Sequence, residues 1–112
     1  MSDIAKLTNE LIKFRDNRDW AQFHDARNLA LAIGLEAAEL NELFLWKKDN
    51  EVESINIERI KEELADVFAY SLLLAHKYNL DFNEIVLEKI KKNAEKYPVE
   101  KSKGTAKKYD EL

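Results

Sequence analysis

The sequence predicts an all-α protein, a bundle-like subunit with four main helices, and two observations carry that prediction. The 112 residues include only 2 glycines and 1 proline, too few turn formers for an all-β domain. Apolar residues recur at spacings of three and four along most of the chain, which is the period of one helix face. A chain of this length is expected to fold as one domain over residues 1–112, and its small core favours a homo-oligomer.

The N-terminal half is expected to contain two helices separated by a structured loop. Ser2 or Asp3 suits the N-cap of a first helix whose apolar stripe runs to Phe14. Residues 17–27 lose the helical period and form the loop. The second helix is predicted over about residues 28–47, with Asn28 as a plausible N-cap.

A turn at Asp49-Asn50 and an exposed connection lead to a third helix, predicted at about residues 57–78. Asp81 and Glu84 have capping-box spacing, which predicts that a fourth helix begins there. That helix must end near Tyr97, because a proline at the next position disfavours a helical residue before it. By composition, the tail over residues 99–112 is expected to be a loose terminus.

Composition excludes several classes of protein. Hydrophobic residues make up 46% of the chain, too many for a disordered protein, and charged residues make up 36%, too many for a membrane protein. No cysteine is present for a disulfide or a thiolate metal site. The net charge of −4 argues against general DNA or RNA binding. Without a secretory pattern or a spanning apolar run, a cytoplasmic protein is expected.

Two acidic pairs with the same spacing lie on the second and third helices. Glu36 falls within the apolar face of its helix, with Glu39 at the border, and Glu63 and Asp66 project together from the next helix. Antiparallel packing would bring the pairs together, and oxygen ligands without His or Cys suit Mg²⁺, with Mn²⁺ as a substitute. The alternative, two solvated charged edges, is about equally well supported by position alone.

The fourth helix carries Lys89, Asn93 and Lys96 on one stripe, which would suit a polyphosphate near metal-binding acids. Taken alone, the stripe is better explained as lysine stems covering apolar surface. The aromatic residues Trp20 and Trp46 offer flat surfaces for a nucleobase, but core or interface packing is commoner for each.

An ordered set of motifs resembles the all-α NTP pyrophosphatases of the MazG-like superfamily, with the nearest match in its dCTP pyrophosphatase branch. The set covers the chain from about residue 14 to the end. It comprises Arg18-Asp19-Trp20, Gln22-Phe23-His24, Arg27-Asn28-Leu29, Glu36-Ala37-Ala38-Glu39-Leu40, Leu43-Phe44-Leu45-Trp46, Glu62-Glu63-Leu64-Ala65-Asp66-Val67, Tyr70, Lys89, Asn93, Lys96-Tyr97-Pro98 and Lys108-Tyr109-Asp110-Glu111-Leu112.

The resemblance implies hydrolysis of a nucleoside triphosphate, dCTP ahead of dATP, to the monophosphate and pyrophosphate. It implies a homo-oligomer, either a dimer or a tetramer built as two dimers, and an ordered C-terminal tail. The residues that match family site positions are Glu36, Glu39, Glu63 and Asp66 for Mg²⁺, Trp20 and Trp46 for the base, Tyr70 for the sugar, Lys89, Asn93 and Lys96 for the phosphates, and His24 nearby.

The chain has no Cys and no Ser set beside a His and an acid, so water is expected to attack the α-phosphorus, with Glu39 the first candidate to accept its proton. A di-iron carboxylate bundle is a rival, but its Glu-x-x-His pairs are missing. A non-enzymatic helical interaction module is the other alternative. Trp20 and Trp46 would lie ~27 Å apart along one helix. One subunit could join them only if its loop folds back along the helix, so a pocket that contains both is expected to be shared between subunits.

Overall fold

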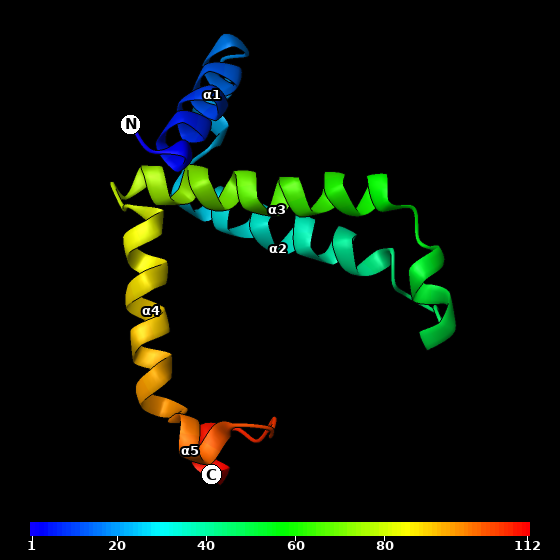
Figure 1. The fold of residues 1–112 in the computed structure, drawn as a ribbon. Coiled ribbons are helices and arrows are strands. Elements are labelled where there is room, and N and C mark those ends of the chain that lie inside the picture. Colours follow the sequence, from blue (N-terminus) through cyan, green and yellow to red (C-terminus); the bar gives the residue numbers. More distant parts are fainter. The chain divides into compact units, whose positions relative to one another are not determined.

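Helices and turns make up the whole protein, and the all-α fold class is confirmed (Figure 1). The computed structural model describes all 112 residues. It divides into two compact units, residues 1–79 and residues 80–112. The α-helices are α1 (Asp3–Asn17), α2 (Ala26–Glu42), α3 (Ile57–Lys77), α4 (Phe82–Lys96) and α5 (Val99–Ser102), and 3-10 helices span Ala21–Phe23, Asp49–Ser54 and Tyr109–Glu111.

Each of the four long helices begins at a side chain that accepts a hydrogen bond from a backbone N–H of the first turn. These N-cap residues are Ser2, Asp25, Asn56 and Asp81. The bond satisfies one of the donors that a helix start leaves without an intrahelical partner. The predicted caps at Ser2 and Asp81 are confirmed, as are the predicted limits of α3 and the end of α4 before Pro98.

The predicted limits of α2 were wrong at both ends. Asp25 is the N-cap, and the backbone N–H of Asn28 donates to its Oδ1 at 2.8 Å, so Asn28 lies inside the helix. The helix ends at Glu42 instead of continuing to residue 47. A series of tight turns follows, in which Trp46 adopts a left-handed φ of 65°. The continuous apolar pattern of these residues conceals the end of the helix.

The first unit is organised around α3. Helix α2 runs alongside α3 in the opposite direction, and α1 packs against α3 (Figure 1). Five side chains are buried, namely Leu29, Leu43, Leu72, Leu73 and Ala75. This core is small, and α3 contributes to it only toward its C-terminal end, since Ile57, Leu64 and Phe68 remain exposed.

The second unit contains α4, α5 and the final 3-10 helix. The Ser102 hydroxyl donates to the backbone oxygens of Tyr97 and Pro98, and the Tyr109 ring meets the edge of Tyr97 at 6.2 Å between centroids. The expectation of a loose terminus was therefore wrong. Composition did not reveal it, because the order comes from contacts between specific side chains, including an aromatic contact between residues 12 positions apart.

No helix combines the length and the apolar character that crossing a membrane requires.

Candidate functional site

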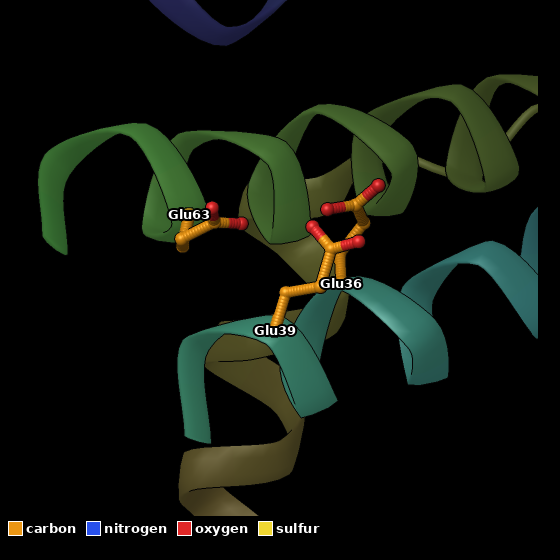
Figure 2. A group of neighbouring side chains, drawn as sticks. All are labelled: Glu36, Glu39 and Glu63. Carbon is orange, nitrogen blue, oxygen red and sulfur yellow. The ribbon is translucent and has the colours of Figure 1, made fainter. Parts of the chain in front are cut away.

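Three carboxylates from two helices meet between α2 and α3. One oxygen each from Glu36 and Glu39 on α2 and from Glu63 on α3 lie within 4.8 Å of one another. Figure 2 shows the two α2 side chains extending toward the helix that carries Glu63. We call these three residues the acidic cluster. Antiparallel packing of α2 and α3 thus brings together three of the four acids that the sequence predicted to meet.

Asp66 lies one turn after Glu63 on α3 and is exposed. It is not among the three clustered side chains, but its negative charge raises the pKa of both Glu36 and Glu63. Asp66 also lines the neighbouring cavity. It therefore connects the acidic cluster to that cavity.

Burial and mutual repulsion raise the pKa of two of the three carboxylates in the acidic cluster. Burial, a hydrogen bond with Glu39 and repulsion from the surrounding carboxylates raise the pKa of Glu36 to about 7. Burial first, and then Glu39 and Asp66, also raise the pKa of Glu63, against a smaller opposing effect of Arg59. Both Glu36 and Glu63 keep an Oε2 atom that is buried and has no hydrogen-bond partner.

No basic side chain forms an ion pair with these acids. The three ion pairs of the protein join Glu10 to Lys13, Asp16 to Arg15, and Glu58 to Lys61. Buried polar atoms are rarely left unpaired in native proteins. Converging carboxylate oxygens with free lone pairs match the oxygen ligands that Mg²⁺ and Mn²⁺ prefer, so the residues fit a divalent cation.

A cavity of about 230 Å³ lies beside the cluster. It is mostly apolar and is lined by Leu11, Phe14, Arg15, Trp20, His24, Asp66, Ala69, Tyr70 and Leu73. The ring of Trp20 meets the edge of Phe14 at 5.7 Å, and the Arg18 guanidinium lies 3.7 Å from the centroid of the Phe14 ring. Four of the residues singled out from the sequence therefore share one cavity: Trp20, His24, Asp66 and Tyr70.

His24 and Tyr70 form a neutral polar pair in this cavity. Their rings meet edge to face with centroids 6.1 Å apart. Burial, and then the positive charge of Arg15, lower the pKa of His24, which favours the neutral imidazole. Burial and the nearby acids, Glu36 first, raise the pKa of Tyr70. The buried Nδ1 of His24 has no partner and remains available to a polar group of a ligand.

The other residues singled out from the sequence lie elsewhere. Trp46 is 88% exposed and does not line the cavity that contains Trp20, so one subunit does not join the two tryptophans. Lys89, Asn93 and Lys96 lie on α4, in the unit that does not contain the acidic cluster.

Five cavity residues were not identified as site residues from the sequence, namely Leu11, Phe14, Arg15, Ala69 and Leu73. Phe14 was assigned only to the apolar face of the first helix. The available signal was Arg15, a charged residue four positions after Leu11 and beside Phe14 on that face. Its side chain is only 20% exposed.

The comparisons with known proteins agree with one another. The sequence profile of the MazG-like family matches residues 31–112. The whole chain is 40% identical to dCTP pyrophosphatase 1 of Mus musculus and 38% identical to that of Homo sapiens, covering 67% of each relative. The crystal structure of a pyrophosphatase from Archaeoglobus fulgidus is 36% identical and superposes with a TM-score of 0.81, over 88% of this chain and 94% of that one.

The raised pKa of Glu36 predicts how the metal-free protein responds to pH. The folded state binds the proton of Glu36 more tightly than the unfolded chain, whose reference pKa is 4.5. The free energy of unfolding should therefore fall as pH rises from about 4.5 to about 7. At pH 7.5 without divalent cations, Glu36→Gln removes this repelled charge and should raise the Tm by about 4 °C or more. That shift corresponds to a gain of ~1 kcal/mol in the free energy of unfolding for a chain of this size.

Thermal unfolding followed by circular dichroism at both ends of this pH range measures the effect. Glu62→Gln is the matched control, because Glu62 is exposed and lies outside the acidic cluster. Two results would contradict repulsion at Glu36. One is a Tm of Glu36→Gln no higher than that of the parent at pH 7.5. The other is a Tm increase over the parent at pH 4 as large as the increase at pH 7.5.

Proposed function

The chain belongs to the MazG-like family and is a nucleoside triphosphate pyrophosphatase, and we propose that it hydrolyses dCTP to dCMP and pyrophosphate with Mg²⁺. One observation carries the assignment of the site, namely an acidic cluster with unpartnered buried oxygens beside an aromatic cavity. The curated relatives align with the whole chain, which supports a single functional domain over residues 1–112.

Glu36, Glu39, Glu63 and Asp66 are the proposed metal ligands, with Mn²⁺ as an alternative cation. When bound, the cation neutralises phosphate charge and lowers the pKa of a bound water. Glu39 is exposed, whereas Glu36 and Glu63 are half-buried, so Glu39 is the proposed acceptor of the proton from the attacking water. Water oxygen attacks the α-phosphorus, the bond from the α-phosphorus to the bridging oxygen breaks, and pyrophosphate leaves.

The cavity is the proposed site of the nucleoside. Its volume of about 230 Å³ is below the ~300–1,000 Å³ of pockets that enclose drug-sized ligands, which favours the base and part of the sugar over a whole nucleotide. Trp20 offers the base a stacking surface, and His24 a neutral polar atom. Tyr70 is the proposed sugar contact, because it lies between this cavity and the charges of the cluster.

The phosphates are proposed to bind Lys89, Asn93 and Lys96. These residues share a stripe on α4 at positions i, i+4 and i+7, and none of the three ion pairs of the protein occupies the two lysines. Two ammonium groups and an amide would counter the charge that the leaving pyrophosphate develops.

A homo-oligomer, a dimer or a pair of dimers, is the proposed functional state. Large apolar residues exposed on α2 and α3 include Leu31, Leu35, Ile57 and Leu64. The left-handed φ of Trp46 costs on the order of 1 kcal/mol, and the subunit gives its exposed side chain no packing in return. A second copy would account for both features if it covered the exposed helix faces and if Trp46 packed beside the nucleobase bound to that copy.

We predict that Glu36→Gln and Asp66→Asn each reduce turnover of dCTP at least about 100-fold while the protein stays folded, since even indirect partners of a metal site affect activity ~10–100-fold. Pyrophosphate release from a panel of dNTPs, with and without Mg²⁺, measures turnover and ranks dCTP against dATP. Glu62→Gln should behave like the parent protein. Near-normal release by either site variant would remove the metal-site assignment.

The base pocket predicts that Trp20→Ala and Trp46→Ala each raise the KM for dCTP about 10-fold or more, because stacking on an aromatic contributes ~1–3 kcal/mol per base. Mg²⁺ binding should not change, and Trp→Phe variants should recover most of the affinity. Steady-state kinetics beside melting temperatures separate this result from a core role, in which Tm falls and KM does not.

Light scattering should find a dimer or tetramer at micromolar concentration. Leu35→Glu should reduce the measured mass, because Leu35 is 68% exposed and a charge there would oppose burial against a second copy. A parent protein that scatters as a monomer would contradict the proposed assembly.

A further inference from the structure

The C-terminal segment returns to the end of α4. Gly104 has a φ of 78°, a conformation that suits glycine, within the turn that follows α5. The last 3-10 helix then places Tyr109 against the edge of the Tyr97 ring. The ammonium nitrogen of Lys96 lies 4.9 Å from the centroid of the Tyr109 ring. All of these contacts lie within residues 80–112.

The Tyr109 ring attracts the Lys96 ammonium group without occupying its N–H donors, as a carboxylate partner would. A cation attracted to an aromatic face keeps its full charge and does not depend on a hydrogen bond to an acceptor. A carboxylate partner would occupy N–H donors and would compete with phosphate for the ammonium group. Lys96 takes part in none of the three ion pairs, so its N–H donors are not committed to an acid.

We propose that Tyr109 is a positioning residue that holds the Lys96 ammonium group for the pyrophosphate portion of the substrate. The proposal rests on the proposed function, which places Lys96 at the phosphates. It also gives the C-terminal segment a specific role, because its aromatic ring restricts the flexible stem of a lysine that binds phosphate.

The test is calorimetric binding of inorganic pyrophosphate, in the presence of Mg²⁺, to the full-length protein. Tyr109→Leu should weaken binding about 2- to 5-fold, the change that corresponds to a cation–ring contact of ~0.5–1 kcal/mol at an exposed site. Tyr109→Phe keeps the ring face and should bind like the parent. The double variant Lys96→Met/Tyr109→Leu should bind no more weakly than Lys96→Met alone.

Lys89 provides the matched control, because it shares the stripe with Lys96 but forms none of the three cation–ring contacts. The effects of Lys89→Met and Tyr109→Leu should therefore add. If the effects of Lys96→Met and Tyr109→Leu add as well, Tyr109 acts on the fold of the tail and the proposal is wrong. Parent-like binding by Tyr109→Leu, or equal loss in Tyr109→Phe, would also overturn it.

A second readout does not depend on Tyr109→Leu folding well. The ε-methylene protons of Lys96 should show an upfield ring-current shift in NMR spectra of the parent protein, and an ordinary lysine shift would overturn the contact. Turnover of dCTP by the parent protein tests the proposed function separately. A protein that binds pyrophosphate as expected but hydrolyses no dNTP would refute that function and leave the role of Tyr109 intact.

Discussion

The repulsion among closely spaced carboxylates is the constraint on which the rest of the site depends. Packing α2 against α3 brings Glu36, Glu39 and Glu63 together, and two of the three keep a buried oxygen without a partner. Burial of unpaired charge opposes folding, and the protein buries only five apolar side chains that could offset this cost. The arrangement is costly as a purely structural feature, whereas a divalent cation would turn the same repulsion into coordination.

Under the proposed function, the cavity and the acidic cluster would divide the binding of a nucleotide between two environments. Apolar and aromatic side chains line the cavity, where the only carboxylate is Asp66, and the cluster is purely acidic. Tyr70 connects them, because it lines the cavity while Glu36, Asp66 and Glu39 raise its pKa. A nucleobase would suit the apolar, aromatic cavity, whereas a triphosphate with its metal ion would suit the acidic cluster. This division would account for the presence of carboxylates between α2 and α3 in so small a protein.

Much of this structure could be predicted from local sequence rules. The caps at Ser2 and Asp81, the extent of α3 and the meeting of the acidic pairs follow from spacing and helix geometry. The end of α2 did not, because apolar residues continue from Leu43 to Trp46 beyond the last helical residue, Glu42, and no glycine marks the end. Composition did not predict the ordered tail, because contacts between specific side chains, such as those of Tyr109 with Tyr97 and Lys96, hold it in place. Arg15 was overlooked although it lies four positions after Leu11, because a single charged residue beside an apolar face does not by itself indicate a cavity.

The central claim is that the acidic cluster is a cation site, and binding of Mn²⁺ tests it most directly. Calorimetric titration at pH 7 should show binding by the parent protein and by Glu62→Gln, but binding weakened at least about 10-fold by Glu63→Gln. Binding should also release protons, seen as a heat that depends on the ionisation enthalpy of the buffer, because the pKa of Glu36 is raised to about 7 and metal requires the carboxylate. Absence of binding, or equal binding by Glu62→Gln and Glu63→Gln, would contradict the account.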